Sequence, residues 1–218
     1  MDSINLNKYL IPTTKDYIFN ETPLFINYDK WIKGINNVLY VTGLSGTGKG
    51  YYAKQIAKNK KNCIIIELDK FENYIWYINK PENNPSIKAG DEIIYNYLKS
   101  NYDLSYDIFQ NNITNYNQIL TEFYDYLLWY TSEHSQTSFI IEGIQIFSDK
   151  AFNKISNNDS IVILRSSTVK SMQKVLDREH NTIRNRMHTY TDAKKMLKEF
   201  ELRFSSGISM SSKQELIE

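Results

Sequence analysis

The sequence predicts an α/β fold with a parallel sheet and helices on both of its faces. Apolar runs with the length of strands buried on both sides recur at residues 38–42, 63–68, 138–141 and 161–164. Segments with helical spacing separate and follow these runs, and this alternation is typical of parallel strands joined by crossover helices. Ligands bind at the carboxyl ends of strands in such sheets, so the residues that follow each run are the candidates for a functional site.

The 218 residues suit one domain of generous size, and the hydrophobic fraction of 41% is enough for a core. We expect an N-terminal extension over residues 1–35, a main domain over 36–204 and a C-terminal tail over 205–218. Within the main domain we expect a helical insert at about 70–136, folded over the mouth of the site, and an arginine-bearing lid at about 166–190. The insert should contain helices at 91–99 and 116–132, and the C-terminal part should contain helices at 169–187 and 192–204.

Charge and cysteine content narrow the class of protein. The formal net charge of +1 disfavours a broad nucleic-acid-binding surface, although it leaves room for a local basic groove. Cys63 is the single cysteine, which excludes an internal disulfide framework and fits a reducing compartment. It stands at the head of an apolar run, which predicts a buried thiol. With no apolar stretch near the ~18 residues of a membrane span and no evident signal peptide, we expect a cytoplasmic protein without a membrane partner. The sequence leaves the oligomeric state open.

A glycine-rich turn after the first strand carries the clearest chemical signal. It reads Gly43-Leu44-Ser45-Gly46-Thr47-Gly48-Lys49 and leads into a helix-like stretch. Backbone N–H groups and the positive end of the helix dipole converge in such a turn and favour polyphosphate, while Lys49 can reach the β- and γ-phosphates. The residues expected to bind the nucleotide are Gly43, Ser45, Gly46, Thr47, Gly48, Lys49, Gly50 and Tyr51. The alternative is a glycine-rich turn that binds no ligand.

The residue after Lys49 is Gly50, where the commonest turn of this kind has a Ser or Thr whose hydroxyl binds Mg²⁺. Tyr51 comes next. We therefore expect Mg²⁺ to be held by nucleotide oxygens, water and an outer carboxylate, because this ion keeps several of its waters.

Two carboxylates follow the second and third strands. Asp69 should lie across from the glycine-rich turn, where it could take the proton of an acceptor hydroxyl or hold that hydroxyl in line. The alternative for Asp69 is a helix N-cap. Glu142 is expected on the metal side of the site, with a packed salt bridge as its alternative. Glu67, two residues before Asp69, is expected to be structural.

The fourth strand leads to Arg165 and then to a helix-like stretch with Arg178, Arg184 and Arg186. Guanidinium groups suit transferring phosphates, and a lid that carries them would also exclude water. The alternative is a solvated helix face paired with nearby acidic residues.

The insert is rich in aromatic residues, which could stack on a base. Phe71 and Tyr74 are the candidates for an acceptor pocket. The alternative, favoured by the spacing over residues 123–130, is the core stripe of a helix. The three histidines show no metal-ligand spacing, so no zinc site is expected.

Taken in order, residues 43–50, the strand ending Asp69-Lys70-Phe71, the sequence Ile141-Glu142-Gly143 and the arginine-bearing stretch resemble the P-loop nucleoside/nucleotide kinase family. The Gly-Lys-Gly ending is similar to that of adenylate and guanylate kinases. The second- and third-strand motifs look most like uridine kinases, and zeta-type toxin kinases are similar in layout. The resemblance covers roughly residues 36–204. It implies a three-layer P-loop NTPase fold with strand order 2-3-1-4 among the four strands, ATP as donor, and Asp69 as the acceptor-side base.

The function expected from these observations is an ATP-dependent kinase that passes the γ-phosphoryl group to a small-molecule acceptor, a nucleoside, nucleotide or nucleotide sugar. Lys49 would neutralise charge, Glu142 would hold hydrated Mg²⁺, and the lid arginines would cover the transfer. One alternative is a polynucleotide 5′-end kinase, which the near-neutral charge disfavours. Another is a catalytically weak, nucleotide-binding regulatory protein.

Overall fold

The computed structural model describes four stretches of the chain: residues 23–75, 84–102, 116–165 and 183–205. Within these stretches, the side chains of residues 72–75, 183–191 and 205 are not described.

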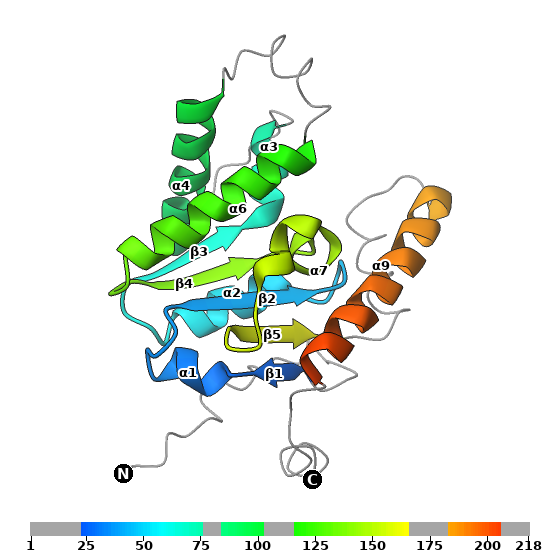
Figure 1. Cartoon of the computed structure of the whole chain (residues 1–218), viewed down its shortest axis with the longest axis horizontal. Coiled ribbons are helices and arrows are strands. Elements are labelled where there is room, and N and C mark those ends of the chain that lie inside the picture. Colours follow the sequence, from blue (N-terminus) through cyan, green and yellow to red (C-terminus); the bar gives the residue numbers. More distant parts are fainter. Residues whose placement is uncertain (1–22, 76–83, 103–115, 166–182, 206–218) are drawn as a thin grey trace.

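Five strands form one sheet in the described part of the chain: β1 (Leu24–Ile26), β2 (Val38–Gly43), β3 (Cys63–Glu67), β4 (Ser138–Glu142) and β5 (Ser160–Leu164). Their order is β1-β5-β2-β4-β3 (Figure 1). The pairs β3–β4, β4–β2 and β2–β5 are parallel, whereas β1 pairs antiparallel with β5. The α/β class predicted from the sequence is confirmed.

The sheet is mixed, which corrects the expectation of a parallel one. The antiparallel strand β1 lies in the stretch expected to be an N-terminal extension, and it forms the β5 edge of the sheet. With three residues directly after Pro23, it is too short for its apolar pattern to be recognised as a strand.

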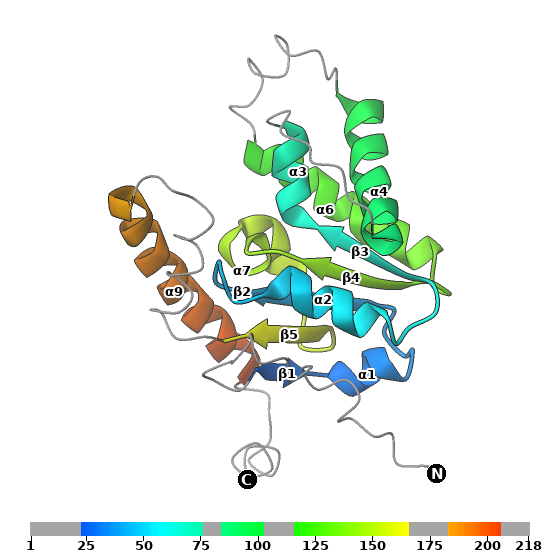
Figure 2. The ribbon, with the colours of Figure 1, turned by 180° about the vertical axis from the view of Figure 1, so that it is seen from behind.

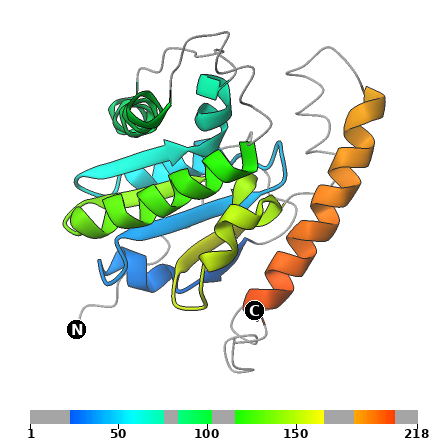
Figure 3. The same ribbon diagram turned by 45° about the horizontal axis from the view of Figure 1, so that its top comes forward.

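Helices lie between and after the strands: α1 (Tyr28–Ile32), α2 (Lys49–Ala57), α3 (Leu68–Ile75), α4 (Pro85–Asn101), α6 (Tyr116–Glu133), α7 (Gln145–Ser148), the 3-10 helix η3 (Lys150–Lys154) and α9 (Ile183–Ser205). Helix α2 covers one face of the sheet (Figure 2), and α6, α7 and α9 lie on the other (Figures 1 and 3). Successive strand residues point to opposite faces, so Val41 and Ile65 pack on the α2 side while Tyr40 and Ile66 pack on the α6 side.

The insert contains the two expected helices, α4 and α6, each somewhat longer than expected. Helix α4 begins at a conventional cap, where the Asn84 side chain accepts hydrogen bonds from the N–H groups of Ser86 and Ile87. It lies so close to β3 at Gly90 that a Cβ on this residue would overlap the carbonyl oxygen of Ile65. Gly90 therefore allows a helix backbone to approach the edge strand closely.

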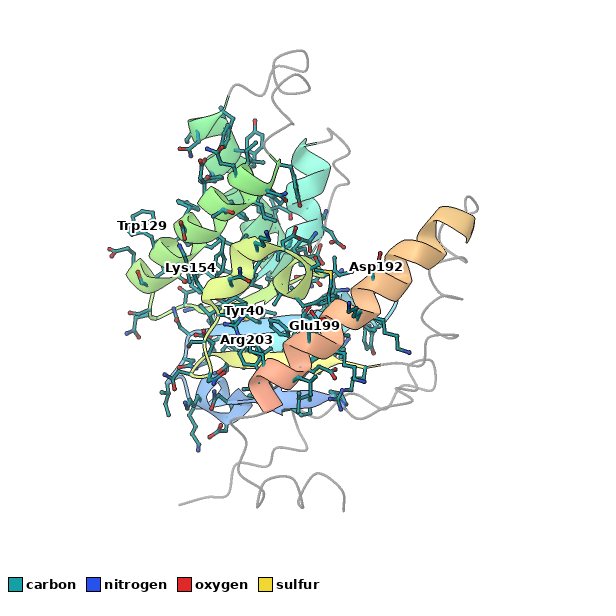
Figure 4. The ribbon with its side chains drawn as sticks, turned by 45° about the vertical axis from the view of Figure 1, so that its right-hand side comes forward. Tyr40, Trp129, Lys154, Asp192, Glu199 and Arg203 are labelled. Carbon is teal, nitrogen blue, oxygen red and sulfur yellow. The ribbon has the colours of Figure 1, made fainter. Side chains whose placement is uncertain are left out.

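Several of the described aromatic residues of the insert pack in the core, as their helical spacing favours. The ring of Phe123 lies 5.1 Å from that of Tyr97 and 4.7 Å from that of Phe71, centroid to centroid. Trp129 is different, since it points away from α6 into solvent while Tyr40 lies inside the molecule (Figure 4).

The C-terminal segment differs from the expectation of two helices with a break near residues 188–191. Helix α9 runs without interruption through that region. Residues 188–191 contain neither glycine nor proline, so nothing in the sequence forces a break there. After residue 191, α9 buries one stripe of residues at helical spacing: Ala193, Leu197, Phe200 and Phe204.

Candidate functional site

The glycine-rich turn joins β2 to α2 and has a backbone that side chains other than glycine rarely adopt. Gly43, Gly46 and Gly48 have φ of 146°, 82° and 89°. Gly48 is the N-cap of α2, so the first N–H groups of that helix lie at the end of the turn. A Cβ on Gly43 would overlap the carbonyl oxygen of Leu164 at the end of β5.

Two side chains brace this turn from within. The Lys49 ammonium donates to the carbonyl oxygens of Gly43 (3.1 Å) and Leu44 (3.3 Å), and its residue is only 9% exposed. The Thr47 hydroxyl donates to the Leu44 carbonyl at 2.8 Å. The turn thus has a defined shape around a buried cation.

A cavity of about 320 Å³ opens beside the turn, between the start of α2 and the carboxyl ends of β3 and β4. It is lined by Gly46, Gly48, Lys49, Gly50, Tyr51, Lys54, Glu67, Asp69, Lys70 and Glu142. Most of the residues predicted for the site therefore meet in one cavity. Of the residues predicted in the turn, three do not line it: Gly43 packs against β5, the Thr47 side chain turns inward, and Ser45 is exposed elsewhere on the turn.

Glu142 is a buried acid of the cavity with a raised pKa. The pKa of its carboxyl is raised to about 8, first by burial and then by the charges of Asp69 and Glu67, while Lys49 opposes the shift. The carboxyl lies at the end of β4 and is 6% exposed, and its Oε2 has no hydrogen-bond partner among the described residues. A buried oxygen without a partner is costly, and such groups are found where a ligand supplies what is missing.

Glu67 belongs to the cavity too, which corrects the expectation that it is only structural. Its Cα is the register partner of the Cα of Glu142, so the two glutamates end adjacent parallel strands side by side. A Cβ on Gly50 would lie 3.5 Å from an Oε1 of each. The sequence concealed this pair, because the apolar run of the second strand continues to residue 68 and the third run stops at residue 141.

Asp69 lies in the first turn of α3, because β3 ends at Glu67 and the helix begins at Leu68. It is exposed, and its Oδ1 accepts a hydrogen bond from Nε2 of Gln145 at 3.2 Å. The next residue, Lys70, is buried and pairs with Asp91 of α4 at 3.5 Å. The sequence did not indicate Lys54, Lys70 or Gln145, since lysine and glutamine in helices have no diagnostic spacing.

The insert covers less of the cavity than expected. Helix α3 contributes Asp69 and Lys70, but no residue in the described parts of α4 and α6 lines the cavity. Phe71 is fully buried and stacks on Phe123, so it is a core residue and not part of an acceptor pocket. Tyr74 falls among the side chains outside the description.

The arginines of the expected lid stay a prediction. Arg178 lies outside the described residues, and Arg184 and Arg186 lie on α9 where side chains are not described. Arg165, which follows β5, is paired through Nε with Glu201 at 3.0 Å and does not line the cavity.

The described residues form neither a metal-binding cluster nor a membrane-spanning helix, and no family is identified for the chain. Among the described residues, no three His, Cys, Asp or Glu side chains are grouped so that they could hold a metal ion by themselves. In the same stretches, no helix has the length and apolar character needed to cross a membrane. No protein-family model matches the chain, and a search of curated proteins finds no significant match.

Proposed function

We propose that this protein is a P-loop phosphotransferase that passes the γ-phosphoryl group of ATP to a small-molecule acceptor, a nucleoside, nucleotide or nucleotide sugar. The observation that carries the proposal is that the glycine-rich turn with Lys49 opens into the same cavity as the carboxylates of Asp69 and Glu142. Phosphoryl transfer depends on positioning and on neutralising charge more than on covalent chemistry, and this cavity has groups for both.

The turn supplies the donor side of the site. N–H groups at Gly46 and Gly48 and the N-terminus of α2 suit the β- and γ-phosphate oxygens. The Lys49 ammonium can exchange its carbonyl partners for phosphate oxygens, because a charge-assisted bond to an anion is stronger than one to a neutral carbonyl.

The donor set fits a hydrated Mg²⁺. Glu142 has a buried oxygen without a partner, Glu67 lies beside it, and Gly50 leaves the space between them free of a side chain. When bound, Mg²⁺ would neutralise charge on the phosphates. Two carboxylates are too few to hold it alone, which is consistent with an ion that keeps water and nucleotide oxygens in its shell.

Asp69 supplies the acceptor side. Its carboxylate is exposed at the cavity wall, where it could accept the proton of an acceptor hydroxyl or orient that hydroxyl. Lys54 and Lys70 line the same cavity; Lys54 adds positive charge that suits an anionic substrate, whereas Lys70 is paired with Asp91. In the resemblance stated above, Arg178, Arg184 and Arg186 would close over the phosphates.

The test is Lys49→Ala, assayed with γ-labelled ATP against a panel of nucleosides, nucleotides and nucleotide sugars. We expect transfer to fall by about 10²–10³-fold, the effect of removing one preorganised charge-stabilising group. Lys58→Ala is the matched control, because Lys58 is an exposed lysine that follows the same helix and lies outside the cavity. Equal turnover in wild type and a folded Lys49→Ala protein would refute the proposal.

The same assay separates the two alternatives. Label on the 5′ ends of oligonucleotides, with strongly salt-dependent binding, would favour a polynucleotide kinase. Calorimetric binding of ATP without transfer to any acceptor would favour a regulatory nucleotide-binding protein.

A further inference from the structure

We infer that Gln145 is a positioning residue that fixes the carboxylate of Asp69 before an acceptor arrives. This inference rests on the proposed function, in which Asp69 faces the acceptor. The contact that carries it is the hydrogen bond from Nε2 of Gln145 to Oδ1 of Asp69, 3.2 Å long and formed between residues 76 positions apart.

Gln145 is buried, and the backbone before it is held by hydrogen bonds. It is 1% exposed and is the first residue of α7, directly after the turn that follows β4. That turn is tied to the central strand twice: the N–H of Gly143 donates to the Val41 carbonyl at 3.2 Å, and the Thr42 hydroxyl donates to the Gly143 carbonyl at 2.8 Å. A Cβ on Gly143 would overlap Oε1 of Gln145, so the glycine makes room for this side chain.

Asp69 needs such a partner because its own position is poorly constrained. It is an exposed residue in the first turn of α3, where its carboxylate would otherwise sample several rotamers. An ionised carboxylate only accepts hydrogen bonds, so the amide NH₂ of Gln145 is the end that must face it. The hydrogen bond to Oδ1 therefore fixes the direction of the Asp69 carboxylate, because the amide that donates it is buried and held in place just after β4.

The expected consequence is an effect on turnover and not on ATP binding. Gln145 does not line the cavity, so it touches no phosphate of the donor. A misplaced catalytic group can cost about 10²-fold in rate even when binding is intact. Loss of the Gln145 amide should therefore lower kcat by about 10–100-fold and leave the KM for ATP unchanged.

A double-mutant cycle tests this dependence on Asp69. Transfer from γ-labelled ATP to a mixture of ribonucleosides and their 5′-monophosphates is measured for Gln145→Met, which keeps the approximate size, loses the donor and cannot ionise, and for Asp69→Ala with and without it. If Gln145 acts through Asp69, Gln145→Met has no further effect in the Asp69→Ala background. An equal loss in both backgrounds, or a wild-type kcat for Gln145→Met, overturns the inference.

Gln118→Met is the matched control, because Gln118 also donates to a carboxylate, that of Glu122 at 2.8 Å, but on the exposed surface of α6. We expect wild-type transfer from it. Thermal unfolding of each variant identifies any that fail to fold, and Gln145→Asn, whose shorter side chain withdraws the amide from Asp69, then takes the place of Gln145→Met in the cycle.

A second readout needs no turnover and separates this inference from the proposed function. In the free protein, the side-chain amide protons of Gln145 should exchange slowly with water. In Asp69→Ala their NMR signals should move from the wild-type positions, and their exchange with water should become faster. If wild-type protein labels no acceptor, the proposed function fails, and the amide signals alone decide the inference. Unchanged amide exchange in Asp69→Ala would show that the hydrogen bond is not formed in solution.

Discussion

The carboxyl edge of the sheet has two halves that use charged residues in opposite ways. At the β3–β4 half, Glu67 and Glu142 end their strands facing a cavity. At the β2–β5 half, Gly43 packs against Leu164 and the next residue of the chain, Arg165, is paired with Glu201 of α9. The β2–β5 half is closed by internal partners, whereas the β3–β4 half opens on a cavity with both carboxylates and lysines in its wall.

This difference shows where the chain tolerates an energetic cost. Glu142 keeps a buried oxygen without a described partner, and its pKa is raised by burial. Nothing comparable occurs at the described β2–β5 end, where the polar groups named above have partners. A cost confined to one half of an edge supports a ligand-binding role for that half and an anchoring role for the other.

The largest loss of stability should come from truncating a buried apolar side chain near the β3–β4 half. Phe71→Ala removes a fully buried ring of α3 that stacks on Phe123 of α6, and it should cost about 3–5 kcal/mol of unfolding free energy. Urea unfolding measures this loss, and Phe71→Leu should lose less. A stable Phe71→Ala protein with impaired transfer would instead place Phe71 in an acceptor pocket.

The next effect compares Gly43 in the turn, beside the β2–β5 half, with Gly50 in the first turn of α2, beside the β3–β4 half. Gly43→Ala combines a left-handed φ of 146° with overlap on the Leu164 carbonyl, so we expect a loss of at least about 1–3 kcal/mol from strain. Gly50→Ala places its Cβ at 3.5 Å from the two glutamates, an ordinary contact, and alanine favours the helix. Melting temperatures should drop for Gly43→Ala and stay near wild type for Gly50→Ala; equal drops would remove the contrast.

Much of this arrangement could be predicted from the sequence, for reasons that differ by residue. The four longer strands and the meeting of Lys49, Asp69 and Glu142 follow from continuous apolar runs and from the rule that parallel strands present their carboxyl ends together. Strand β1 was missed because three residues carry too little pattern. Gln145 was not predicted because a long-range amide contact depends on packing between α7 and α3, which leaves no periodic trace.

The pH dependence of the unfolding free energy tests the raised pKa of Glu142. Its folded pKa of about 8 lies above the ordinary value near 4.5, so the folded state holds this proton more tightly than the unfolded chain does. The unfolding free energy should therefore fall as pH rises from about 4.5 to about 8. Glu142→Gln cannot ionise, so its stability relative to wild type should increase across that window. Urea unfolding at about pH 5 and about pH 8.5 measures the difference, and parallel pH curves would contradict it.

The smallest effect should come from the ion pair of the β2–β5 half. Arg165 and Glu201 are partly exposed, with side chains 31% and 20% accessible, so solvent screens their attraction. Arg165→Gln should cost about 0.2–1 kcal/mol and leave both ATP binding and transfer at wild-type levels, because Arg165 lies outside the cavity. Glu201→Gln should cost a similar amount, and the double variant should lose less than the sum, since both singles break the same pair. Impaired transfer in a stable Arg165→Gln protein would mean that the β2–β5 half also contacts substrate, and the division of the edge into an anchoring half and a binding half would then be wrong.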